Sequence, residues 1–271
     1  MILPPELERG ARFTSVGSMV VLEVCVESPE GVRAARAGGA QRAELCCALG
    51  AGGLTPSHGC VAAAVAVGGI EVVVLVRPRG GDFVHGEEEL ALMERDVACA
   101  RQMGAAGVAL GCLTPGGEID EAGCARLIRC AGPLGVTFHR AFDFVREPEP
   151  ALECLVRLGV ARVLTSGQEA SALEGRACIA RLVRAARGRI QVVAAGGVRA
   201  EHARELVRAT GVDALHFSAS VRQASAAREG NPRVRLASAA RSPGEDAHWE
   251  TDAGRVRAVA EVLRSAERGE G

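Results

Sequence analysis

Residues 20–26 read VVLEVCV, an apolar run in which a glutamate and a cysteine occupy alternate positions. Successive side chains of a β-strand point to opposite faces of the sheet, so Glu23 and Cys25 share one face and the aliphatic residues share the other. Residues 42–46 read RAELC and place a second glutamate and a second cysteine in the same alternation. Each segment therefore predicts a strand with one apolar face and one face that carries a glutamate and a cysteine.

Strand-like runs recur along most of the chain, and an amphipathic stretch of helical period follows each one. We predict eight of them: Val20–Val26, Arg42–Cys46, Glu71–Val76, Gly107–Cys112, Val136–Phe142, Ala161–Thr165, Ile190–Ala194 and Ala214–Ser218. Glycines such as Gly39 and Gly211 stand just before several of these runs, where a helix commonly ends in a left-handed residue. Even βα spacing predicts an α/β protein with the (β/α)8 TIM-type barrel in a single domain. A doubly wound open sheet is the alternative.

Two segments lie outside this pattern. Residues 1–18 are expected to be a flexible N-terminal extension, and Met19 could be the functional start of a barrel that spans residues 19–271. Residues 222–252 are rich in Ala, Arg, Ser and Gly without a clear period, which predicts a long loop after the eighth strand. A final helix is expected over residues 253–268.

The composition excludes several functions. The chain has 271 residues and a net charge of −1, so it offers no basic surface for nucleic acid. All 32 basic residues are arginine. Without lysine there is no Schiff-base aldolase, no pyridoxal-phosphate aldimine and no P-loop lysine, and no other nucleotide-binding motif is evident.

Ten cysteines are present, but none forms a C-x-x-C pair, and the N-terminus lacks the order of a secretory signal. These features predict a cytoplasmic protein with reduced thiols. The most apolar segment, residues 61–76, is interrupted by two glycines and a glutamate, so no membrane span is expected.

Polar residues gather at inward positions near the predicted strand ends, where barrels usually place their active sites. The candidate acid–base residues are Glu23, Glu44, His139 and Asp143. The candidate anion-binding residues are Arg77, Arg79, Thr165, Ser166, Gly196, Gly197, His216 and Ser218. The alternative is a set of satisfied core groups, for example an ion pair of Glu23 with Arg77. Burying so many charges is costly, which favours a functional pocket.

Several segments resemble the CutC family of copper homeostasis proteins. They are Glu23–Cys25, Arg42–Cys46, Gly52–Ser57, Arg77–Phe83, Thr137–Asp143 and Arg162–Gly167, in consistent order between about residues 20 and 220. The resemblance implies a (β/α)8-type barrel and a cytoplasmic homodimer or homotetramer. It also implies Cu(I) binding, with Cys25 and Cys46 as the metal ligands.

Two functional hypotheses remain open. Two thiolates from neighbouring strands suit the soft Cu(I) ion. The surrounding carboxylates, arginines and histidine are more typical of an enzyme that acts on a small anionic metabolite, phosphorylated or carboxylated. A purely structural role leaves the inward polar residues unexplained.

Overall fold

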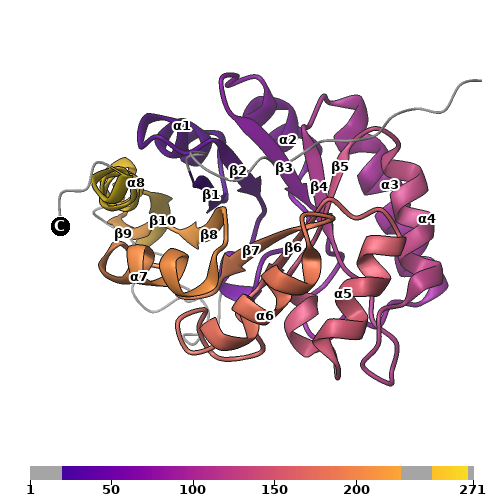
Figure 1. Cartoon of the computed structure of the whole chain (residues 1–271). Coiled ribbons are helices and arrows are strands. Elements are labelled where there is room, and N and C mark those ends of the chain that lie inside the picture. Colours follow the sequence, from indigo (N-terminus) through magenta and orange to yellow (C-terminus); the bar gives the residue numbers. More distant parts are fainter. Residues whose placement is uncertain (1–19, 227–245, 268–271) are drawn as a thin grey trace, which may run out of the picture.

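The computed structural model describes residues 20–226 and 246–267 (Figure 1). Eight parallel strands close into one barrel in chain order, which confirms the predicted fold. The strands are β1 Val21–Val26, β2 Arg42–Leu45, β3 Glu71–Leu75, β4 Gly107–Leu110, β5 Gly135–Phe138, β6 Arg162–Thr165, β7 Gln191–Ala195 and β8 Ala214–Ser218. Strand β1 pairs with both β2 and β8 and so closes the sheet.

Helices cover the outside of the barrel (Figure 1). They are α1 Pro29–Ala37, α2 His58–Val65, α3 Glu87–Gln102, α4 Glu121–Ala131, α5 Pro148–Arg157, α6 Arg176–Ala186, α7 Ala200–Thr210 and α8 Ala253–Glu267, with short 3-10 turns η1 Leu49–Ala51 and η2 Arg140–Phe144. Local sequence sets their ends: Ser28 caps α1 by accepting the Gly31 N–H at 3.0 Å. Gly211 ends α7 with φ +73°, as the glycine pattern predicts.

The alternation in the strands separates two cores. Leu22, Val24 and Val26 of β1 belong to the large core between the strands and the helices. Cys25 belongs instead to a small cluster inside the barrel, together with Cys46 and side chains of β3 and β4. The lumen is therefore filled by side chains in layers, as in other barrels of this type.

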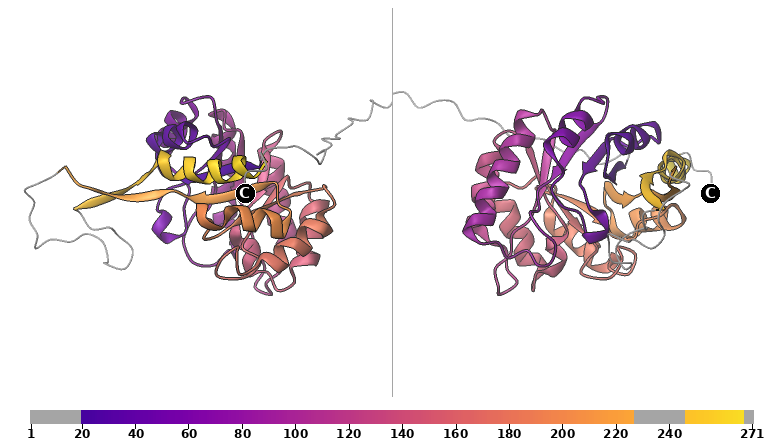
Figure 2. Two further views of the ribbon diagram at one scale, coloured as in Figure 1. Left: turned by 60° about the vertical axis from the view of Figure 1, so that its left-hand side comes forward. Right: turned by 180° about the vertical axis from the view of Figure 1, so that it is seen from behind.

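The segment over residues 222–252, which the sequence predicts to be a loop, contains strands in the structure. Strand β9 (Ser220–Ala224) pairs antiparallel with β10 (Ala247–Thr251), and this hairpin projects away from the barrel (Figure 2). The Asp252 N–H donates to the Ala219 carbonyl at 3.0 Å, so the exit of β8 and the start of α8 are held together. Strands β9 and β10 therefore pair because the fold holds the start of one beside the end of the other, although their sequences show no alternating pattern. Residues 227–245 and the predicted extension at 1–18 lie outside the described residues.

All ten cysteines are free thiols. Within the described ranges, no helix has the length and apolar character that crossing a bilayer requires.

Candidate functional site

A cavity of about 320 Å³ opens at the carboxyl ends of the strands. Eight of the sequence-predicted residues line it: Cys25, Glu44, Arg77, His139, Gly196, Gly197, His216 and Ser218. Two more lie just behind this wall, since Glu23 contacts His216 and Cys46 contacts Cys25. The structure thus brings groups from six strands and their loops to one end of the barrel.

The lowest polar layer consists of Glu23, Arg42 and His216, and both oxygens of the Glu23 carboxylate are used. Oε1 lies 2.7 Å from His216 Nδ1, and Oε2 accepts from Arg42 Nε. Burial would raise the pKa of Glu23, but the hydrogen bond and charge of His216, together with Arg42, lower it to about 2. Glu23 therefore pairs with Arg42 and not with Arg77, and its carboxylate is ionised and fully engaged.

A second layer, one step nearer the mouth, contains Cys25, Cys46 and Glu44. The two Sγ atoms lie 3.6 Å apart, and Cys25 Sγ lies 3.5 Å from Glu44 Oε2. The neighbouring Cys46 thiol and burial raise the pKa of Cys25 well above its ordinary value, so that thiol is protonated at neutral pH. Burial also raises the pKa of Glu44, whose Oε1 is buried without a partner.

Donor atoms of this layer and of His216 are close enough to share one metal ion. One ligand atom each of Cys25, Glu44 and His216 lies within 4.8 Å of the others. His216 Nε2 is 3.7 Å from Glu44 Oε2, while its other nitrogen is held by Glu23. A carboxylate behind a histidine is the arrangement that orients imidazole ligands in metal sites.

Arg77 forms one wall of the cavity, and its guanidinium is held by backbone carbonyls. Nη1 donates to the carbonyls of Ala51 (3.3 Å) and Gly53 (3.2 Å), and Nη2 donates to that of Gly81 (2.8 Å). Nε is buried without a partner. Gly52 lies beside it with φ +89°, a conformation that favours glycine, and a Cβ there would lie 2.9 Å from Arg77 Nη1. Burial and the charge of Arg79 lower the pKa of Arg77.

His139 stands at the end of β5, across the barrel from β1, and caps η2. Its Nδ1 accepts the Ala141 N–H at 3.2 Å, and its Nε2 is buried without a partner. Burial and the charge of Arg77 lower the pKa of His139 to about 3. The imidazole is therefore neutral under physiological conditions.

Four further predicted residues also lie outside the cavity wall: Arg79, Asp143, Thr165 and Ser166. Arg79 turns outward to Glu89, with Nε 2.5 Å from Oε1. Asp143 is a structural junction between η2 and β6: it accepts from the Thr165 hydroxyl (2.6 Å), from the Ser166 N–H (2.9 Å) and from Arg140 Nε (2.8 Å). Asp143 remains a predicted acid–base residue that this geometry does not favour, because its oxygens are already occupied.

Three residues near the site were not predicted from the sequence. Arg42 shares the inward parity of Glu44, and that parity could have identified it. Arg140 lines the cavity and donates to Ser166 Oγ at 3.0 Å, but it follows the end of a strand, where alternation carries no information. Phe83 lies in a loop, with the Arg77 Cζ 4.7 Å from its ring centre.

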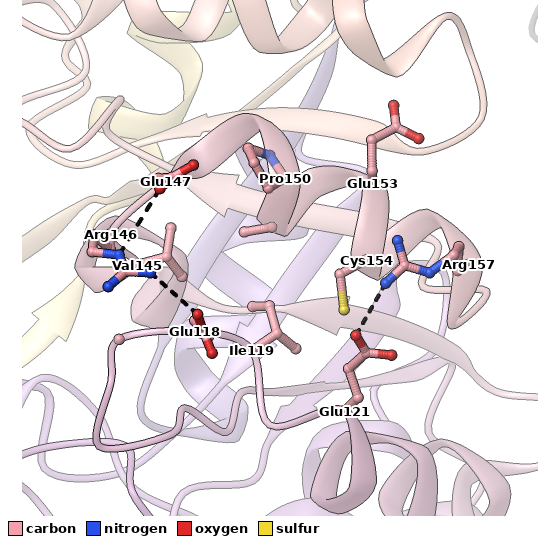
Figure 3. Close-up of a pocket in the computed structure, with 12 residues that line it drawn as sticks. Glu118, Ile119, Glu121, Val145, Arg146, Glu147, Pro150, Glu153, Cys154 and Arg157 are labelled. Atoms are coloured by element: carbon pink, nitrogen blue, oxygen red, sulfur yellow. Dashed lines mark hydrogen bonds and ion pairs between the residues drawn. The ribbon is translucent and has the colours of Figure 1, made fainter.

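A second cavity, of about 370 Å³, lies against α5 on the outside of the barrel (Figure 3). Its charges pair with one another: Arg146 with Glu118 at 3.2 Å and Arg157 with Glu121 at 3.0 Å. Burial and Glu121 raise the pKa of Cys154, the thiol in its wall, to about 12. Of the buried side-chain polar atoms that lack partners in the described ranges, none belongs to this cavity. The strand-end cavity is therefore the better candidate site.

Fold and site together define a (β/α)8 barrel whose mouth encloses buried thiol, imidazole, carboxylate and guanidinium groups. The CutC family model matches residues 20–221, and the chain belongs to the CutC family. A family protein CutC of Mesorhizobium japonicum is 46% identical over 222 residues, covering 82% of this chain and 86% of the relative. The human copper homeostasis protein cutC homolog is 40% identical and covers 90% and 89%.

Solved structures agree with this assignment. A CutC protein from Streptococcus agalactiae superposes with a TM-score of 0.70 at 34% identity, covering 73% of this chain and 98% of that one. A thiamine phosphate pyrophosphorylase from Pyrococcus furiosus, with a TM-score of 0.56 at 15% identity, shares the barrel fold alone.

Proposed function

We propose that this protein is a cytoplasmic, homo-oligomeric copper homeostasis protein that binds Cu(I) through Cys25 and Cys46. The observation that supports this function is the pair of free, buried thiols 3.6 Å apart on adjacent strands. Thiolate sulfur is the soft ligand that Cu(I) prefers. The names of the relatives that belong to the same family agree with a role in copper homeostasis.

Binding at this pair must be coupled to loss of protons. The pKa of Cys25 is raised by the Cys46 thiol and by burial, so the ion has to displace a proton that neutral solvent does not remove. Copper affinity is therefore expected to rise with pH. His216 and Glu44 lie beside the thiols as additional donors. Because imidazole and carboxylate suit Zn(II) as well, we expect Zn(II) to compete weakly at this site.

The test is an anaerobic Cu(I) titration against a competing chelator. Wild type, the double variant Cys25→Ser with Cys46→Ser, and the control Cys99→Ser on α3 are compared. We expect the double variant to lose tight binding and the control, a partly buried thiol on the outer helices, to keep it. Equal affinity in the double variant and wild type would show that these thiols are not the ligands.

A second candidate function is an enzyme acting on a small anionic metabolite in the same cavity. It is favoured by two cavity-lining residues, Arg77 and His139, in each of which a buried side-chain nitrogen (Nε and Nε2) lacks a partner. Buried donors without acceptors are destabilising by roughly 1–3 kcal/mol each, which a bound oxyanion would relieve. Lysine-dependent chemistry is excluded, because every basic side chain of the protein other than histidine is arginine.

This candidate is tested by thermal-shift titration with inorganic phosphate and with malonate. Ser218→Phe serves as the blocked control, because Ser218 is exposed at the cavity rim and a large ring there would fill it. We expect the anions to raise the melting temperature of wild type more than that of Ser218→Phe. An equal rise in both proteins would reflect general salt stabilisation and exclude the site.

A further inference from the structure

The ring of His139 is fixed in one orientation by its surroundings. Its backbone N–H donates to the Leu110 carbonyl at 2.9 Å, and Nδ1 accepts the Ala141 N–H at 3.2 Å. Gly111 leaves room for the ring, because a Cβ at that position would lie 2.6 Å from Cε1 of His139. The ring of Phe83 packs against it with 5.1 Å between the ring centres. Nδ1 is consequently engaged, and Nε2 is the ring nitrogen that has no partner among the described residues.

The bond from Ala141 also determines where the imidazole proton lies. A backbone N–H can only donate, so Nδ1 must offer its lone pair, and in the neutral ring the proton is on Nε2. Burial and the charge of Arg77 keep the ring neutral by lowering its pKa to about 3, and His85 acts in the same direction. In this state His139 has no free lone pair, so it is neither a general base nor a cation.

Arg77 presents a second donor under the same conditions. Its Nη1 and Nη2 atoms are engaged by backbone carbonyls, which leaves Nε without a partner in the buried side chain. The guanidinium lies over the ring of Phe83, with Cζ 4.7 Å from the ring centre. The same ring packs against His139. Both side chains line the strand-end cavity. Two N–H groups, one neutral and one cationic, therefore belong to residues that line the cavity and have no protein acceptor among the described residues.

We propose that His139 Nε2–H and Arg77 Nε–H are the donors for an oxyanion, the carboxylate or phosphate end of a small ligand, and that His139 acts as a neutral hydrogen-bond donor. This inference rests on the second function proposed above and changes the role of His139 in it from acid–base residue to oxygen-binding residue. A neutral donor beside a fixed positive charge suits an oxygen on which negative charge is present or develops.

The experiment observes the histidine ring directly. Long-range ¹H–¹⁵N spectra of ¹⁵N-histidine-labelled protein are recorded between pH 5 and 8, and the His139 signals are identified by their loss in His139→Asn. We expect the pattern of a neutral ring protonated on Nε2 throughout this range. Addition of inorganic phosphate or of malonate should shift the Nε2 signal, and the ligand with the larger shift at lower concentration identifies the preferred oxyanion.

Two variants separate donation from local folding. His139→Asn retains an acceptor near the Nδ1 position and so can keep the bond to Ala141, but it lacks the outer donor. His139→Gln places an amide N–H near the Nε2 position. We expect the asparagine variant to weaken phosphate binding at least about tenfold, and the glutamine variant to weaken it less, because a hydrogen bond to a charged group is at stake.

The outcomes are distinguishable. Titration of His139 near pH 6.5, or a proton on Nδ1, would overturn the inference. So would a wild-type response to phosphate that Ser218→Phe abolishes and His139→Asn leaves unchanged, in which case the anion site itself would stand. Failure of wild type to respond to either anion would reject the anionic-ligand function and the role of His139 together.

Discussion

Two neighbouring layers of the barrel lumen hold the same residue type in opposite states. Glu23, in the lower layer, and Glu44, one step nearer the mouth, are both almost completely buried, at 1% and 5% exposure. Glu23 uses both oxygens, on His216 and Arg42, and its pKa falls to about 2, whereas Glu44 leaves Oε1 unpartnered and its pKa is raised by burial. Depth alone therefore does not determine the state of a carboxylate: the Glu23 carboxylate is fully paired, whereas the Glu44 carboxylate retains an oxygen that can bind a ligand.

The largest expected effect is in the lower layer. Glu23→Gln removes the negative charge that compensates Arg42 while keeping the shape of the side chain. Breaking a buried ion pair leaves an uncompensated charge, so we expect a loss of about 3–5 kcal/mol in the free energy of unfolding. Urea denaturation at pH 7 measures it. A loss below about 1 kcal/mol would mean that the two layers do not differ as described.

Acid should destabilise the protein in two steps. An unfolded histidine takes up a proton near its ordinary pKa of 6.5, but His139 resists protonation until about pH 3, so stability is lost as the pH falls below 6.5. This group contributes a loss of about 2–3 kcal/mol between pH 6.5 and 4.5. Glu23 adds a second loss below its ordinary value of 4.5, down to about pH 2.

Comparison of urea midpoints of wild type and His139→Asn across this range isolates the first step. The pKa of Glu44 is raised, so in both proteins this group makes the fold more stable as the pH falls toward 4.5, which is opposite in sense to the loss from His139. The pKa of His216 is also raised, and this group lowers stability only as the pH rises above 6.5. Parallel pH profiles for the two proteins would contradict the assignment of the first step to His139.

The smallest expected effect is in the upper layer. Glu44→Gln should change the free energy of unfolding at pH 7 by no more than about 1 kcal/mol, because burial already disfavours the charge that the substitution removes. Relative to this variant, wild type should lose stability as the pH rises above 4.5. The same denaturation experiment, run beside Glu23→Gln, decides whether the two glutamates are as different as their contacts indicate.

The barrel and most of its mouth were predictable, because the period of two in residues 20–26 and 42–46 reports directly which side chains face inward. The prediction weakened where strands end. Strand β3 ends at Leu75, so strand alternation does not extend to Arg79, which was predicted to face inward together with Arg77. In the structure Arg79 points outward and binds Glu89. The β9–β10 hairpin was missed because long-range anchoring, and not local alternation, pairs its strands.

The lower layer also determines how anything can travel through the protein. Glu23 and Arg42 are buried beneath the cavity, and side chains fill the lumen around them. The cavity is therefore open at one end of the barrel, and no channel runs through the lumen. Whatever binds at the mouth has to leave by the way it entered. Delivery of a bound ligand to another molecule would thus require that the recipient approach the same rim. A ligand therefore cannot enter the cavity while another leaves it.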